Sequence, residues 1–284
     1  MERCFRQIKY YMKRLLLLSV LLAAVSCAPK TFTIVQIADS QLGFDAAVKS
    51  QEPGAEYIND LSFEVEFLTK AVMEVNRIKP DMVVFTGDQI HLPLDTEQRT
   101  AFCEAVSKID KSVKVLYLPG NHDVVLGENS VDSTPFTSLF GEDRFVYNID
   151  GVTVMGLNSN LIKYNDPSEQ QQLLWIKNEL SKTNPDDVKI VFAHHPFFME
   201  NIDEEDSYFP IQQSKRKQYF DIFEETGVDA VYAGHYHESS YGEYNGIPMR
   251  TTTSAAYQLG ASKPSIRLIT VIDGESIQDE FIQL

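Results

Sequence analysis

The sequence predicts an α/β protein built on mixed β-sheets. Short runs rich in Val, Ile, Phe and Tyr alternate with longer segments in which apolar residues recur every three to four positions, and the chain from residue 246 onward reads as strands. Such alternation favours parallel strands joined by helices, whereas the strand-like end adds antiparallel pairs. With 284 residues, 43% of them apolar, the chain suits one large domain.

Strands are predicted where an apolar, β-branched run is bounded by Gly, Pro, Asn or Asp. Five such runs read as buried strands, at residues 32–37, 82–85, 115–118, 190–192 and 230–232. Asp150-Gly151 is a strong two-residue hairpin signal between two further runs, 145–149 and 152–157. The remaining strands are expected at residues 247–253, 266–272 and 277–282.

Four helices are expected where the apolar period becomes that of an α-helix, at residues 58–77, 96–109, 167–180 and 213–225. The first carries one apolar stripe, formed by Leu61, Val65, Leu68, Val72 and Val75. Pro80 follows its end, where a helix cannot continue. In the third helix, Ser168 is expected to cap the N-terminus.

A short polar segment follows each of the five buried strands, and together these segments hold five of the six histidines of the chain. The segments are Ala38-Asp39-Ser40-Gln41, Thr86-Gly87-Asp88-Gln89, Gly120-Asn121-His122-Asp123, His194-His195-Pro196 and Gly234-His235-Tyr236-His237. In layered α/β folds, ligands bind at the carboxyl ends of the strands. We therefore expect these side chains to meet at one rim.

The residue types in the polar segments suit a pair of divalent metal ions. Aspartate, histidine and asparagine ligands fit Zn, Mn, Fe or Mg. Two such ions that share one carboxylate lower the pKa of a bridging water, so that hydroxide is available near neutral pH. A Ser or Cys nucleophile is then unnecessary, and the chain has no Gly-x-Ser-x-Gly elbow.

At these residues the chain resembles the calcineurin-like metallophosphoesterases. The family pattern is Asp-x-His, Gly-Asp, Gly-Asn-His-Asp/Glu, His and Gly-His-x-His, and the matching segments occur in that order from Asp39 to His237. The resemblance implies a four-layer α/β/β/α sandwich of two mixed sheets. It also implies a metal-dependent phosphoesterase that acts without a covalent intermediate.

The resemblance gives each matching residue an expected role. The expected ligands of one metal ion are Asp39 and His237, and those of the other are Asn121, His194 and His235. Asp88 is expected to bridge the ions, which share the hydroxide that attacks phosphorus. His122 is expected to face the phosphate, stabilise its developing charge and protonate the leaving oxygen. The catalytic set implied in this way is Asp88, Asn121 and His122.

Gln41 departs from the family pattern, which has a histidine at this position. An amide oxygen would make the first metal site harder and favour Mg or Mn over Zn. Gln41 is expected to be a ligand, although a hydrogen bond to the loop is the alternative. The Asp-x-Gln motif, together with residues 197–206 and 254–260, resembles one subgroup of the family, for which the implied activity is a phosphatase with phosphoserine or phosphothreonine protein as a substrate class.

Other residues are expected beside the metal ligands rather than on the metal. His91, three residues after Asp88, is a candidate to orient His122. His195 and Asp123 are expected to support the ligands. Two more residues are candidates for substrate binding: Arg216, whose guanidinium fork suits phosphate, and Tyr208, which can wall the cleft. The alternatives are an exposed helix face for Arg216 and core packing for Tyr208.

The N-terminus reads as a lipoprotein signal peptide. Residues 1–14 carry five basic side chains and one acidic, and residues 15–25 form an apolar stretch too short to span a bilayer. Ala24-Val25-Ser26-Cys27 resembles a bacterial lipobox, so residues 1–26 would be removed, Cys27 would carry lipid, and residues 27–284 would form a single domain. The expected location is the bacterial envelope, facing the periplasm; ordinary secretion is the alternative, and a permanent anchor is third.

The charge of the chain disfavours nucleic acid as a partner. The formal charge is −16, and the sequence has no basic stripe. Removing the signal peptide with its net +4 takes the charge to −20 and leaves Cys103 as the one cysteine besides Cys27, so no disulfide is expected.

The sequence therefore predicts a lipid-anchored, dinuclear phosphoesterase that acts on phosphate monoesters. Phosphodiesterase activity on the same metals is the alternative, and a non-catalytic metal-binding lipoprotein, suggested by Gln41, is the third reading.

Overall fold

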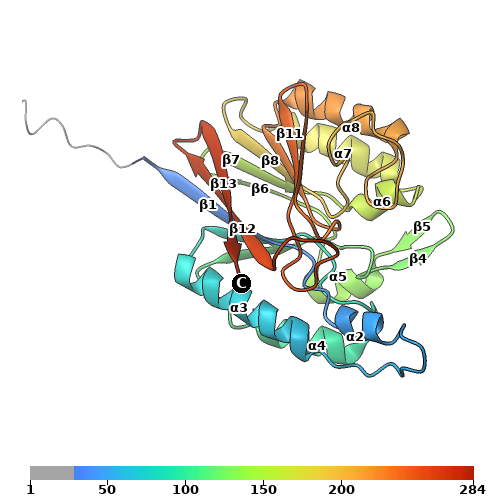
Figure 1. Cartoon of the computed structure of the whole chain (residues 1–284). Helices are drawn as coiled ribbons and strands as arrows, with labels where there is room; N and C mark the ends of the chain where they lie inside the picture. The colour runs from blue at the N-terminus through green and yellow to red at the C-terminus, as the bar shows by residue number, and fades with distance from the viewer. Residues whose placement is uncertain (1–28) are drawn as a thin grey trace, which may run out of the picture. The chain divides into compact units, whose positions relative to one another are not determined.

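Two mixed β-sheets form the centre of the structure, a computed structural model that describes residues 29–284 (Figure 1). The predicted signal peptide and Cys27 lie outside the described residues. Residues Thr31–Leu284 group into one unit. Within the described part of the chain, no helix is long and apolar enough to cross a bilayer.

The first sheet has five strands in the order β13-β12-β1-β2-β3. Their bounds are β1 (Thr31–Ile37), β2 (Met82–Phe85), β3 (Lys114–Tyr117), β12 (Ser265–Ile272) and β13 (Ser276–Gln283). β1, β2 and β3 are parallel, whereas β12 pairs antiparallel with both β1 and β13. The parallel strands therefore end at the same rim of the sheet.

The second sheet has six strands in the order β10-β11-β9-β8-β7-β6. Their bounds are β6 (Phe145–Ile149), β7 (Val152–Gly156), β8 (Val188–Phe192), β9 (Ala230–Ala233), β10 (Ser240–Tyr244) and β11 (Ile247–Thr251). Its four central strands are parallel, and antiparallel hairpins at Asp150-Gly151 and Asn245-Gly246 add the edges β6 and β10. Both sheets are mixed, as the sequence predicts.

Helices cover the outer face of each sheet (Figure 1). They are α3 (Ser62–Ile78) and α4 (Thr96–Val106) on the first sheet, and α7 (Glu169–Leu180) and α8 (Gln213–Thr226) on the second. In β1, Val35 packs in the cluster beneath α3 and α4, while Ile34 packs in a separate apolar cluster between the sheets. Because both faces of the strand are buried, it reads as a continuous apolar run. The α/β/β/α sandwich is confirmed.

The sequence pattern does not predict several short elements, because none of them is long enough for its hydrophobic period to repeat. They are α2 (Phe44–Lys49), α5 (Thr134–Phe140), α6 (Ser159–Lys163) and the hairpin of β4 (Val125–Gly127) with β5 (Ser130–Asp132). The predicted cap of the third helix is wrong in detail: Ser168 precedes α7, but its hydroxyl donates to Asp166 Oδ1 at 2.5 Å and does not cap the helix.

Candidate metal centre

The polar segments after β1, β2, β3, β8 and β9 converge at the rim where these strands end. Five of the expected ligands turn there with a left-handed backbone: Asp39, Gln41, Asp88, His235 and His237, with φ between 37° and 67°. Non-glycine residues adopt this conformation rarely, and it clusters at functional sites.

Asp39, Asp88 and His194 form the buried centre of the site. One ligand atom from each lies within 4.8 Å of the others, and the same holds for His194, His195 and His235. Asp88 Oδ2 lies 3.4 Å from His194 Nε2, and Asp39 Oδ1 lies 3.6 Å from His237 Nε2. Ligand atoms of this kind, gathered away from water, suit the two-metal site that the sequence predicts.

The orientation of His194 directs a lone pair toward that centre. Its Nδ1 donates to the carbonyl of Thr86 at 2.9 Å, which leaves Nε2 facing Asn121 Oδ1 at 3.1 Å and Asp88 Oδ2. In the neutral tautomer, three lone-pair atoms then face one another without a proton between them. A cation resolves that repulsion: a proton on Nε2 can do so in the metal-free protein, and a bound metal ion would do so in its place, so the residues fit a metal ion.

His237 is fixed in the same way. Its Nδ1 donates to the carbonyl of Tyr257 at 2.6 Å, so Nε2 is turned toward Asp39. Two expected metal-binding residues also carry buried atoms without a hydrogen-bond partner, namely Gln41 Oε1 and His235 Nε2. Such atoms are costly unless a further group pairs with them, and a bound metal ion is such a group. Ligation by Gln41 and His235 stays a prediction.

Burial sets the pKa values of the cluster. It raises the pKa of Asp39 to about 8, with the neighbouring charge of Asp88 adding to the shift. Burial acts in the same direction on Asp88, but the imidazoles of His194 and His122 outweigh it and hold the pKa well below the usual range. Burial lowers the pKa of His237 to about 4 and also holds the pKa of His235 well below its usual value, which keeps both in the neutral form that binds metal.

Asp123 joins the loops rather than the metal cluster. Its carboxylate accepts hydrogen bonds from the backbone N–H groups of Gly120 at 2.7 Å and Gln89 at 3.0 Å. It therefore ties the segment after β3 to the segment after β2. A Cβ atom at Gly120 would collide with the carboxylate of Asp88, so this close approach requires glycine.

His91 contacts His122, but not in the way that the sequence suggests. The two rings stack with centroids 4.7 Å apart, and His122 Nδ1 donates to the backbone carbonyl of His91 at 2.9 Å. The side-chain Nδ1 of His91 has no hydrogen-bond partner. Orientation of His122 therefore comes from a backbone acceptor and ring stacking, and a hydrogen bond between the two side chains is not present. His122 also donates its backbone N–H to Asp88 Oδ1 at 2.8 Å.

His195 is buried beside the cluster. The hydroxyl of Ser159 accepts backbone N–H bonds from His194 and His195 and lies 3.1 Å from His195 Nδ1. The ring of His195 is 4.3 Å from that of His235. Its expected supporting role stays a prediction.

The prediction that Arg216 binds substrate is wrong. Its side chain is fully buried and donates to the carbonyls of Ile202, Glu204 and Ile211 at 2.6 to 3.1 Å. Helical periodicity marks a basic residue in the first turn but does not show that this face of α8 points inward. Arg216 instead holds the loop between residues 197 and 212.

Tyr208, on that same loop, does lie at the site. Its side chain is 62% exposed, and its ring centroid is 5.2 Å from that of His235. On the opposite flank, Phe44 contacts the rings of His237, His91 and Tyr257 at 5.1 to 5.6 Å. Sequence reasoning missed Phe44, because an isolated aromatic residue at this position carries no motif, and it gave no site role to Tyr257 within the segment 254–260.

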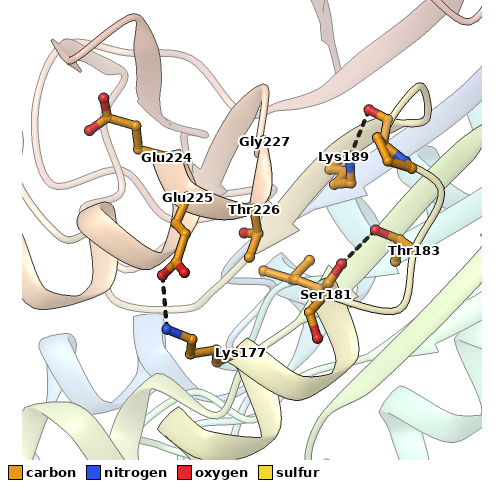
Figure 2. Close-up of a pocket in the computed structure, with 10 residues that line it drawn as sticks. Lys177, Ser181, Thr183, Lys189, Glu224, Glu225, Thr226 and Gly227 are labelled. Carbon is orange, nitrogen blue, oxygen red and sulfur yellow. Dashed lines mark hydrogen bonds and ion pairs between the residues drawn. The ribbon is translucent and has the colours of Figure 1, made fainter.

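A separate hollow of about 440 Å³ lies between the C-terminal ends of α7 and α8 (Figure 2). Lys189 lines it and donates to the carbonyls of Pro185 and Asp187, both at 3.3 Å. Lys189 stands near the start of β8, whereas His194 follows the end of that strand, so the hollow lies roughly 15 Å from the metal centre at about 3.3 Å per strand residue. It plays no part in the site.

Comparison with known proteins identifies the same family that the sequence motifs resemble. A family model described as "Calcineurin-like phosphoesterase" matches residues 32–239. The chain is 31% identical to serine/threonine-protein phosphatase CPPED1 of Homo sapiens and of Pongo abelii, over 78% of this chain and 74% of theirs. It is also 29% identical to a probable cyclic nucleotide phosphodiesterase of Rhodococcus erythropolis, over 63% of this chain and 58% of that protein.

Solved structures agree on the fold. A dimetal phosphatase from Danio rerio superposes with a TM-score of 0.58 at 16% identity, covering 89% of this chain and 98% of that one. Purple acid phosphatase PPD1 from yellow lupin superposes with a TM-score of 0.66 at 14% identity, over 89% of this chain and 52% of that one. The resemblance that the five motifs predict is confirmed.

Proposed function

This chain belongs to the calcineurin-like phosphoesterase family, and we propose that within this family of hydrolases it cleaves phosphate monoesters, with phosphorylated protein as a substrate class. The observation that carries the proposal is the position of Asp88. Its carboxylate faces His194 and lies in the same cluster as Asp39, as a carboxylate shared by two metal ions would. The relatives named as serine/threonine phosphatases support the monoester class.

The proposed ligand sets follow from the side chains at each flank. Asp39, Gln41 and His237 would hold one ion; Asn121, His194 and His235 would hold the other; Asp88 would hold both. Two divalent ions supply Lewis acidity and a hydroxide near neutral pH. Mn, Mg, Fe and Zn all suit these donors.

The proposed work of the protein side chains is to hold the phosphoryl group and move a proton. His122 is half-buried at the rim, and its Nδ1 is committed to the carbonyl of His91. Because Nδ1 donates to that carbonyl, Nε2 carries a proton only in the imidazolium form, and in that form His122 would pass this proton to the leaving oxygen. Asn121 keeps Oδ1 toward His194, and its amide nitrogen, which interacts with the hydroxyl of Tyr208, has a second N–H that would face the substrate side.

The test is an assay of the protein from residue 30 onward, loaded separately with Mn, Mg, Zn or Fe. We expect two ions per chain and turnover of p-nitrophenyl phosphate at least about tenfold faster than bis-p-nitrophenyl phosphate. Faster diester cleavage would favour the phosphodiesterase alternative, for which the relative in Rhodococcus erythropolis and a probable glycerophosphodiester phosphodiesterase at 29% identity are the supporting observations. Bound metal without turnover of either ester would leave the non-catalytic lipoprotein.

The location that we propose is the bacterial envelope, with a lipid on Cys27 and the domain facing the periplasm. Its support is the lipobox-like segment Ala24-Val25-Ser26-Cys27. Two acyl chains or more give stable anchoring, and a charge of −20 would not bind anionic lipid by itself. Cys27→Ala is expected to abolish labelling by radioactive palmitate and to release the protein from membranes. Labelling that persists in the variant, or a wild type found only in the medium, would contradict the proposal.

A further inference from the structure

We propose that the hydroxyl of Tyr208 donates a hydrogen bond to the third non-bridging oxygen of a phosphate monoester and thereby favours monoesters over diesters. The inference rests on the proposed function, because it concerns the substrate class of the same site. It depends on three features: where the ring lies, what holds its loop, and which way the phenol proton is free to point.

The ring of Tyr208 lies over the His235 flank of the cluster. Its centroid is 5.2 Å from that of His235 and 5.2 Å from that of Phe209. Phe209 in turn contacts the rings of His235 and Tyr236, at 5.6 and 4.9 Å. The two aromatic residues thus form a corner against an expected metal ligand, and Tyr208 is the more exposed of the two.

Two basic side chains hold the loop that carries this corner. Lys163 Nζ donates to the carbonyls of Ser207 at 3.1 Å and Pro210 at 2.6 Å, on either side of the aromatic pair. Arg216 holds three more carbonyls of the same loop. Tyr208 is therefore exposed to substrate but fixed at its backbone, so that little ordering entropy is lost when a ligand contacts it.

The hydrogen bond with Asn121 leaves the phenol proton free. Asn121 Oδ1 faces His194 Nε2, and the Asn121 amide group donates to the phenolic oxygen of Tyr208. The oxygen of Tyr208 is thus an acceptor in this contact. A phenol is protonated at neutral pH, so Tyr208 keeps one O–H to donate.

The two ester classes differ in what that O–H would meet. A monoester has three non-bridging oxygens that share negative charge, whereas a diester has two and carries a second ester group in place of the third. Two non-bridging oxygens can be shared with divalent ions, and the third requires donors from the protein. A hydrogen bond to a charged acceptor contributes about 1.5–3 kcal/mol, whereas an ester oxygen is a weaker acceptor.

The experiment compares Tyr208→Phe with the wild-type protein, both loaded with Mn. We expect kcat/KM for p-nitrophenyl phosphate to fall by about 10- to 150-fold, the equivalent of one hydrogen bond to a charged acceptor. The value for bis-p-nitrophenyl phosphate should change by less than about threefold. Inorganic phosphate, measured by calorimetry, should bind more weakly by a similar factor as the monoester, with two Mn ions per chain retained.

Tyr241→Phe is the matched control, since it removes an exposed phenol that donates to Glu243 at 2.8 Å. Equal losses for both esters, or no loss for either, would overturn the assignment of Tyr208. If the wild type turns over neither ester, the proposed function fails. Phosphate binding then still decides the present inference, because an unchanged affinity in Tyr208→Phe would contradict it.

Discussion

Asp88→Asn is expected to lower kcat by at least about 10³-fold, whichever ester is the better substrate. The carboxylate is the proposed shared ligand, and charge stabilisation by bound metal ions contributes several kcal/mol to such reactions. The change should leave the fold intact. Asn tolerates the left-handed backbone of position 88, where φ is 50°, and its amide oxygen can still accept the N–H of His122.

Asp81→Asn is the control for this prediction. Asp81 lies just before the start of β2 and accepts hydrogen bonds from Thr33, at the opposite end of the strand from Asp88. We expect it to keep full activity. Thermal melting and metal analysis complete the comparison: a folded Asp88→Asn protein that retains two metals and more than a tenth of wild-type turnover would rule out Asp88 as the shared ligand.

Metal affinity is expected to rise steeply with pH, by up to about tenfold per pH unit for each proton displaced. Burial raises the pKa of Asp39 to about 8. Burial alone would lower the pKa of His194, but the carboxylates of Asp88 and Asp39 outweigh it and raise that pKa to about 9. Both groups therefore hold protons in the metal-free protein at pH 7. Mn titration by calorimetry at pH 6.5, 7.25 and 8 should show that binding releases protons and that the affinity for Mn increases with pH.

The same pKa shifts predict how the stability of the metal-free protein changes with pH. A group whose pKa is raised in the folded state binds more protons there, so its contribution is lost as pH rises toward the folded pKa. Asp39 and His194 both act in this direction between pH 6.5 and 8. Lys163, whose pKa burial lowers to about 8, acts in the opposite direction from about pH 7 upward. The histidines whose pKa burial lowers also oppose the trend, mainly near pH 6.5, where the unfolded chain still binds their protons; they are His91, His195, His235 and His237. Melting temperatures of chelator-treated protein should therefore fall from pH 7 to 8, and constant values across that interval would contradict these protonation states.

Much of the site could be predicted from sequence because its residues follow strands. Asp39, Asp88 and His194 each come directly after a buried apolar run, and parallel strands bring their ends to one rim. The strand patterns alone do not predict the α/β/β/α order of the layers. Strand patterns show which runs are buried but not which sheet each joins, and the family resemblance supplied that step.

The errors concern side chains whose function depends on a partner distant in sequence. Arg216 looked like a phosphate ligand, because nothing in its helix reveals that the loop from residue 197 to 212 closes over it. The carbonyl of His91, rather than its ring nitrogen, accepts the bond from His122, and every residue has a carbonyl. Phe44 reaches His237 from α2, a helix of six residues that leaves no periodic signal.

The left-handed turns at the metal centre have a consequence for how the protein would respond to selection for heat resistance. A left-handed backbone costs a non-glycine residue roughly 1–2 kcal/mol, and glycine avoids most of that cost. Five such positions coincide with proposed ligands, among them Asp39 and His235. Glycine there would relax the backbone and remove a buried polar group at once. Selection for heat stability alone, without selection for turnover, is therefore expected to favour glycine at these ligand positions. The resulting variants would be more stable and would lack activity.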